Sequence, residues 1–374
     1  MGTARRLGLA TLALAPIGLA YRFALVYRAR AGYPRRELPR VTPADLGMPY
    51  ETTVVHSGDL TLPAWFIPAR DRAPGPGVVL LHGWESGRDR TLPMAVFLHA
   101  AGFHCLTFDI RGHGANAAEV DPISAGEFGL DALAGFQAIL ERPEVTVAAI
   151  SGHSMGAIGA ILAAAADDRV AAVVATSAPS DPYRLTRQTF RLARLPIPNL
   201  VAYPLAWLTT HIYVRPRRHA VRDIDASRAI ARYAGPILLA HGGEDVVVPP
   251  SHLDRLARAA VAARAATLDP AHVETLVVEG GQHSWLYEFP AYRRAVATFL
   301  ATALGGPLPA EDAGRLAADT PADRIPDGEA RFAAVAENSG GLRTLARVAL
   351  PGATQPTIRD EEPLVTATHG RNGR

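Results

Sequence analysis

The sequence of 374 residues contains no lysine, and all 38 of its basic residues are arginines. A phosphate-binding loop of the GxxxxGK[ST] type needs a lysine, and a Schiff-base enzyme needs an amine, so both kinds of site are excluded. Cysteine is almost absent as well, since Cys105 is the only one. The chain therefore has neither an internal disulfide nor a zinc site built from cysteines.

Other signatures are also missing. There is no HExxH motif, and the nearest approach to the dinucleotide-binding GxGxxG pattern, GHGANA at 112–117, lacks the last glycine. The formal net charge is +2, so nothing in the overall charge indicates nucleic acid as a partner. We expect neither a cofactor nor a metal. Hydrophobic residues make up 48% of the chain, enough for one large core.

The amino-terminal 40 residues differ from the rest. They carry eight arginines and one acidic residue, Glu37, for a net charge of +7. The charges flank an apolar run over residues 7–27 that only Arg22 interrupts. Because a membrane-spanning helix needs about 20 apolar residues, and an arginine near one edge can extend to the interface, we expect a single membrane span here.

Two alternatives to this anchor remain open. In one, Arg5 and Arg6 begin a signal peptide that is cleaved after the small-x-small stretch at 18–20, so that the protein is exported. In the other, the run is a helix packed on the domain. The apolar and then basic stretch after residue 20 favours an uncleaved anchor, and the excess of arginines after the run places the catalytic domain in the cytoplasm.

From residue 50 onward, apolar strands alternate with helical patterns. Strands are predicted at 51–57 and 60–69, as an antiparallel pair, and at 77–83, 103–110, 145–152, 170–177, 236–243 and 274–281. Helices are predicted at 92–102, 124–141, 154–166, 251–266 and 291–304. Strands that are apolar on both faces and alternate with helices indicate an α/β fold with a mostly parallel sheet covered on both sides.

The remaining segments set the domain boundaries. Residues 179–233 separate two strands by far more than a crossover requires, so we interpret them as a helical cap. The catalytic domain then covers 50–304, preceded by the anchor or signal and a basic linker over 1–40. Residues 305–374 are predicted to be a largely disordered tail with a helix near 328–350.

The stretch GHSMG at 152–156 lies between a predicted strand and a predicted helix. It fits the G-x-S-x-G pattern, in which glycines permit a sharp turn that exposes the serine at the carboxyl end of the sheet. Downstream, Asp245 and then His283 follow the ends of later strands. Ser154 is therefore the candidate nucleophile, with His283 as its base and Asp245 as the orienting acid; Glu244 is the rival acid.

Two backbone amides complete the candidate site. Acyl transfer to a serine passes through a tetrahedral oxyanion, which needs two preorganised N–H donors. Met155 directly follows the serine, and Trp84 lies in the turn after an early strand. We predict that the backbone N–H groups of these two residues form the oxyanion hole.

At this point the sequence resembles the α/β-hydrolase-fold serine hydrolases, a broad group of esterases, lipases and peptidase-like enzymes. The resemblance rests on LLHGW, FDIRGHG, GHSMG, HGGEDVVVP and GGQH, in this order, and it covers residues 50–304. It implies the α/β-hydrolase fold and the triad of Ser154, Asp245 and His283. It also implies that the histidines at other strand ends mostly shape loops: His82, His113, His153 and His241.

The resemblance assigns the insertion at 179–233 to the variable cap of this group. Its most apolar part, 197–214, is predicted to contribute these acyl-pocket residues: Leu200, Tyr203, Leu205, Trp207 and Leu208. No arginine lies between Arg194 and Arg215, which favours an uncharged small-molecule ester with an apolar acyl chain. A peptidase, a thioesterase or an acyltransferase would use the same triad, and a catalytically inactive interaction protein on this fold is the alternative of another class.

Overall fold

The computed structural model describes residues 3–71, 73–264, 273–323, 325, 345–346 and 348–356, with side chains described from residue 14 onward. The helix that the sequence predicts near 328–350 lies almost wholly outside these residues.

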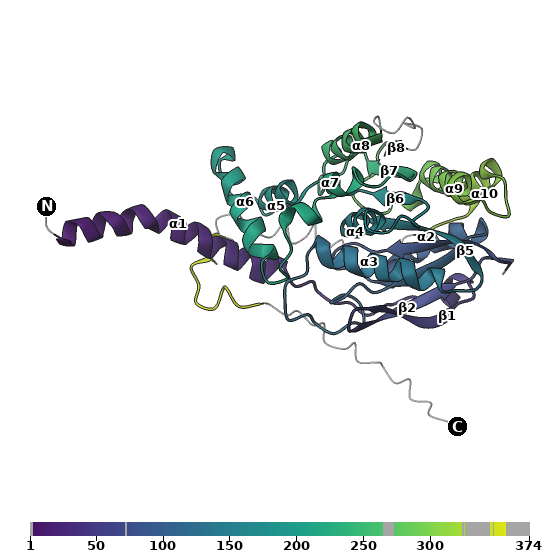
Figure 1. The fold of residues 1–374 in the computed structure, drawn as a ribbon, viewed down its shortest axis with the longest axis horizontal. Helices are drawn as coiled ribbons and strands as arrows, with labels where there is room; N and C mark the ends of the chain where they lie inside the picture. The colour runs from purple at the N-terminus through teal and green to yellow at the C-terminus, as the bar shows by residue number, and fades with distance from the viewer. Residues whose placement is uncertain are drawn as a thin grey trace, which may run out of the picture.

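Within the described residues, eight strands form one sheet in the order β1-β2-β4-β3-β5-β6-β7-β8 (Figure 1). The strands are β1 (Glu51–Ser57), β2 (Leu60–Ile67), β3 (Gly75–Leu81), β4 (His104–Phe108), β5 (Val145–His153), β6 (Val173–Thr176), β7 (Ile237–Gly242) and β8 (Val273–Val278). The β1–β2 and β2–β4 pairs are antiparallel, and every later pair is parallel. The predicted α/β-hydrolase fold with a mostly parallel sheet is confirmed.

Helices cover both faces of the sheet. One face carries α2 (Leu92–Ala100), α9 (Pro290–Leu304) and α10 (Ala310–Asp319); the other carries α3 (Ala125–Leu140), α4 (Met155–Ala164), α7 (Ala226–Ile230) and α8 (Ser251–Arg264). In β3, Val79 and Leu81 pack into the core with α3 and α4, while Val78 and Leu80 pack into the core with α2 and α9. Because helices cover both faces of a central strand, the side chains on both of its faces are mostly apolar.

The insertion between β6 and β7 is helical. It consists of α5 (Pro182–Leu192), α6 (Asn199–Val214), a 3-10 turn at Val221–Ile224, and α7. Asp181 caps the amino-terminal end of α5, where its side chain accepts a hydrogen bond from the backbone N–H of Arg184. Helices α5 and α6 form the cap, whereas Ala229 and Ile230 of α7 are buried in the main core of the domain.

Helix α1 (Thr3–Ala31) extends from the body of the protein and lies against α6 (Figure 1). Its second half is packed, because Phe23 and Val26 are buried in a cluster with Phe190 of α5 and Ala206 of α6. Earlier apolar side chains such as Ile17 remain exposed. The second half of the helix therefore packs on the cap, as in one of the alternatives left open by the sequence.

Across the described part of the chain, no helix is both long enough and apolar enough to cross a membrane. The membrane anchor predicted over residues 7–27 is therefore not confirmed.

The folded body continues past residue 304, where the sequence places the start of a disordered tail. Helix α10 packs against α9 and α2, with Ala313 and Ala317 buried. Arg293 of α9 fixes the end of α10 by donating hydrogen bonds to the carbonyl oxygens of Ala317 (2.9 Å) and Ala318 (2.6 Å). Small alanine side chains make this contact, so the sequence of α10 has no row of large apolar residues from which its packing could be predicted.

Candidate active site

Ser154 lies on a sharp turn between β5 and α4. Its backbone has φ 54° and ψ −116°, a left-handed conformation that is strained for any residue other than glycine. A β-carbon on Gly152 would lie 2.3 Å from the carbonyl oxygen of Gly156, and one on Gly156 would lie 2.4 Å from the carbonyl oxygen of His82. The two glycines of GHSMG are thus required by close backbone contacts on both sides of the serine.

Gly156→Ala should therefore lower the free energy of unfolding by about 1–3 kcal/mol, since the new methyl group must displace the backbone at the end of β3. Urea denaturation of the purified variant measures this change. Gly18→Ala is the matched control, because no atom lies within 4 Å of a β-carbon built at Gly18. Equal stability of Gly156→Ala and the wild type would contradict this interpretation of the turn.

The structure brings Ser154, His283 and Asp245 together at the carboxyl ends of the strands. The Nδ1 atom of His283 lies 2.8 Å from Oδ2 of Asp245, and Nε2 of His283 lies 3.1 Å from Oγ of Ser154. An ionised carboxylate only accepts hydrogen bonds, so Nδ1 carries the proton. Nε2 is left with a lone pair, which accepts the hydroxyl proton of the serine.

The electrostatic environment keeps Asp245 ionised. Burial by itself would raise the pKa of this carboxyl, but hydrogen bonds from His241, His283 and the backbone N–H of Val248 outweigh it and hold the pKa well below its ordinary value. Oδ1 accepts the N–H groups of Val247 (2.9 Å) and Val248 (2.8 Å). The carboxylate is thus fixed in the orientation in which Oδ2 faces His283.

The rival acid, Glu244, is in a different position. Its side chain is exposed, and its backbone N–H donates to the carbonyl oxygen of Gly281. Asp245 is buried and makes the hydrogen bond to His283. The geometry therefore favours Asp245 as the acid.

The two predicted oxyanion-hole residues lie beside the serine. Met155 is the first residue of α4, and Trp84 follows Gly83, at which an added β-carbon would lie 3.3 Å from Cβ of Ser154. Both residues line the same cavity as Ser154. The start of α4 also points the positive end of the helix dipole toward the site, which favours negative charge there.

Four further histidines hold the surrounding loops through backbone contacts. Nε2 of His153 lies 2.8 Å from the carbonyl oxygen of His283. Burial lowers the pKa of His82 to about 4 and that of His113 to about 3, so both are neutral at pH 7. Nε2 of His82 accepts the N–H of Ile110, and Nδ1 of His113 donates to the carbonyl oxygen of Arg111.

The resemblance implies that His153 shapes a loop, and the structure identifies which loop it contacts. Its contact with the carbonyl oxygen of His283, together with a ring-to-ring distance of 4.9 Å, places it against the loop that carries His283. In the sequence, this contact was indicated by the position of His153 immediately before Ser154. The fourth histidine, His241, has its Nε2 atom 2.7 Å from the carbonyl oxygen of Val248 and 3.3 Å from Oδ2 of Asp245, so it supports both the loop that carries Asp245 and the carboxylate.

Ser154 opens onto a cavity of about 1070 Å³. Its walls are mostly apolar and come from three parts of the chain: the body, through residues such as Ile158; the cap, through residues such as Leu185; and α1, through residues such as Val26. Charged side chains also line it: Arg30, Arg35, Glu37, Glu85, Asp181 and Glu244. The volume is at the upper end of the roughly 300–1000 Å³ typical of small-molecule pockets.

The five residues of the cap that were predicted to form the acyl pocket lie outside this cavity. Leu200, Tyr203 and Trp207 are exposed, while Leu205 and Leu208 are half-buried. Helix α6 is apolar on every side, so the sequence could not show which face turns inward. The face toward the cavity carries Thr210 and Tyr213.

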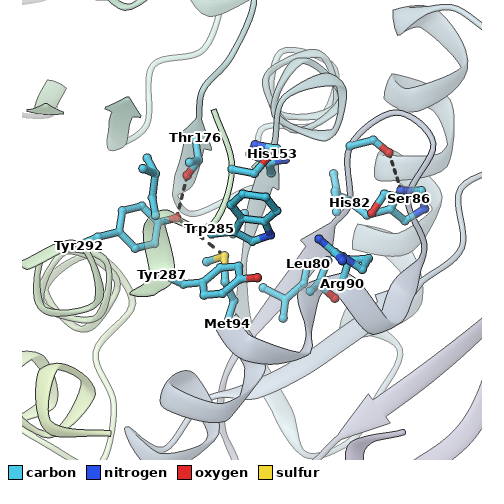
Figure 2. A pocket seen from close by; sticks show the side chains of 16 residues that line it. Leu80, His82, Ser86, Arg90, Met94, His153, Thr176, Trp285, Tyr287 and Tyr292 are labelled. Atoms are coloured by element: carbon cyan, nitrogen blue, oxygen red, sulfur yellow. Dashed lines mark hydrogen bonds between the residues drawn. The ribbon is translucent and has the colours of Figure 1, made fainter. Parts of the chain in front are cut away.

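A second cavity, of about 50 Å³, lies behind the loop that follows His283 (Figure 2). Its walls include His153, Trp285 and Tyr287, and the hydroxyl of Tyr292 hydrogen-bonds to that of Thr176 beside it (Figure 2). The space admits a few water molecules but no substrate. Across the described ranges, no group of three or more His, Cys, Asp or Glu side chains is arranged to hold a metal ion.

The alpha/beta hydrolase family model matches residues 78–297. An uncharacterized protein found in two strains of Mycobacterium tuberculosis is 30% identical over 240 residues, which cover 63% of this chain and 74% of that protein.

Among solved structures, an esterase of Pyrococcus furiosus is similar with a TM-score of 0.58 and 23% identity, over 73% of this chain and 98% of that one. Est1E from Butyrivibrio proteoclasticus, determined with ferulic acid bound, has a TM-score of 0.52 and 17% identity, over 67% of this chain and 98% of that one. At these identities the likeness concerns the fold.

Proposed function

The chain belongs to the alpha/beta hydrolase family, and from the geometry of its site we propose that it is a serine hydrolase that cleaves carboxylic esters with apolar acyl groups. The observation that carries the proposal is the hydrogen-bonded chain from Ser154 through His283 to Asp245, which opens onto a largely apolar cavity. Each member has the partner that its role requires.

In the proposed reaction, Oγ of Ser154 attacks the ester carbonyl carbon while Nε2 of His283 takes the hydroxyl proton. The Asp245 carboxylate stabilises the imidazolium that forms. When the carbon–oxygen bond to the alcohol breaks, His283 returns the proton to the departing oxygen and an acyl-enzyme remains. Water then attacks the acyl carbon and gives one proton to Nε2 of His283. The bond between the acyl carbon and Oγ of Ser154 breaks, His283 returns its proton to Oγ, and the carboxylic acid leaves.

Negative charge develops on the carbonyl oxygen in both steps. We assign its stabilisation to the backbone N–H groups of Met155 and Trp84, helped by the amino-terminal end of α4. A preorganised donor of this kind contributes on the order of 10²–10³ in rate. The position of both residues beside Ser154 supports the assignment.

A substrate series tests the reaction type. We expect purified protein to hydrolyse nitrophenyl esters, and to do so faster than the matched anilides, because the amide nitrogen donates electrons to the carbonyl and is a poorer leaving group than the phenolate. The matched thioesters, which carry the same acyl groups, are compared in the same series. Faster cleavage of an amide or a thioester would indicate a peptidase or a thioesterase with the same triad. Absence of turnover on every substrate would contradict the proposal and favour an inactive interaction protein.

A further inference from the structure

One face of α1 lines the cavity that contains Ser154. The residues on it are Phe23, Val26, Tyr27, Arg30 and Ala31, spaced three and four apart as expected for one side of a helix. From Phe23 to Ala31 this face runs about 12 Å along the cavity at the α-helical rise. The sequence placed this helix outside the catalytic domain, whereas the structure makes it part of the cavity wall.

Contacts with the cap hold α1 in this position. The hydroxyl of Tyr27 hydrogen-bonds to that of Thr189 on α5 at 2.9 Å, and the ring of Phe23 packs edge-on against Phe190 at 5.4 Å. On the adjoining side, Arg28 donates to the carbonyl oxygen of Ile212 on α6. The wall is therefore fixed by polar and aromatic contacts with both helices of the cap.

A short segment near the other end of the chain adjoins this wall. Arg22 of α1 donates from Nε to the carbonyl oxygen of Val348 at 2.7 Å and from Nη2 to that of Leu350 at 2.8 Å. The side chain of Val348 lines the cavity and packs in the same apolar cluster as Phe23. Two distant parts of the sequence thus line the same side of the cavity.

The surface that α1 offers is uncharged over Phe23, Val26 and Tyr27. Burial raises the pKa of the Tyr27 phenol, so it remains neutral, and its hydroxyl is already paired with Thr189. Tyr213, on the neighbouring wall, uses its hydroxyl to donate to the carbonyl oxygen of Ala31 at 2.9 Å. The aromatic and aliphatic carbons of these residues are what a ligand in the cavity would meet.

We propose that the face of α1 formed by Phe23, Val26 and Tyr27 binds the apolar acyl chain of the substrate, together with Leu185 and Leu192 of α5, which line the same cavity. This inference rests on the proposed ester hydrolysis and gives the substrate a class: esters of long, unbranched fatty acids. Each methylene buried against this surface should raise kcat/KM about fourfold.

The test uses full-length protein and the ratio of kcat/KM for nitrophenyl dodecanoate to kcat/KM for nitrophenyl acetate. Val26→Phe should lower this ratio about tenfold or more, since the larger ring fills the space of about two methylene groups of the chain. Val26→Leu, a smaller change, should lower it in the same direction by a few fold. Ile17→Phe is the control on the same helix, because Ile17 is 64% exposed and does not line the cavity; its ratio should match the wild type.

Melting temperatures show which variants are folded, and Val26→Leu carries the test if Val26→Phe unfolds. A wild-type ratio in folded Val26 variants, or an equal fall in Ile17→Phe, would overturn the role of α1 while leaving ester hydrolysis intact. Failure of the wild-type protein to hydrolyse even the acetate would instead contradict the proposed function, and the acyl-chain surface with it.

Discussion

Ser154→Ala should lower kcat for ester hydrolysis by on the order of 10⁴- to 10⁶-fold, because it removes the atom that forms the bond to the acyl carbon. The fold should survive. Alanine keeps the β-carbon of serine, so the strained turn with φ 54° meets no new atom. Stopped-flow or steady-state hydrolysis of a nitrophenyl ester measures the loss, and circular dichroism checks the fold.

Ser284→Ala is the matched control for this variant. Ser284 directly follows His283 and lines the same cavity, but no hydrogen bond joins it to the triad among the described contacts. Its activity should remain within a few fold of the wild type. A folded Ser154→Ala protein with substantial activity would show that another residue is the nucleophile.

Asp245→Asn should lower kcat by about 10⁴-fold with little change in the binding of substrate. An amide in place of the carboxylate can donate to Nδ1 of His283, which stabilises the tautomer with the proton on Nε2. That tautomer cannot accept the hydroxyl proton of Ser154. The measurement is kcat and KM for one ester across the pH range in which both proteins are folded.

Glu244→Gln separates the two neighbouring acids. Glu244 lines the cavity but is exposed, whereas Asp245 makes the hydrogen bond to His283. We expect Glu244→Gln to retain nearly all activity. A larger loss of activity in Glu244→Gln than in Asp245→Asn would show that Glu244, and not Asp245, orients His283.

The central strands could be predicted from sequence because most of their positions are apolar, as over residues 78–81 of β3, and because each ends near a glycine or a polar turn. The serine turn was equally clear, since Gly152 and Gly156 are dictated by backbone contacts that tolerate no side chain. The convergence of Ser154, Asp245 and His283 could be predicted from their positions after strand ends, because parallel strands bring their carboxyl ends to one edge of the sheet.

The walls of the cavity could not be predicted in this way. Helix α6 is apolar all round, so its pattern does not show that Thr210 faces the cavity while Trp207 faces outward. In α1, an apolar run followed by arginines reads as a membrane anchor, yet Phe23 and Val26 pack against the cap. Which surface covers an apolar helix depends on tertiary contacts that its own sequence does not encode.

The most direct test of Ser154 as the nucleophile is labelling by a fluorophosphonate probe, followed by mass-spectrometric mapping of the modified peptide. A phosphonate of this kind reacts only with an activated hydroxyl, so we expect one modified residue, Ser154, and no labelling of Ser154→Ala. Modification of a different residue, or no labelling of the folded wild-type protein, would contradict this assignment.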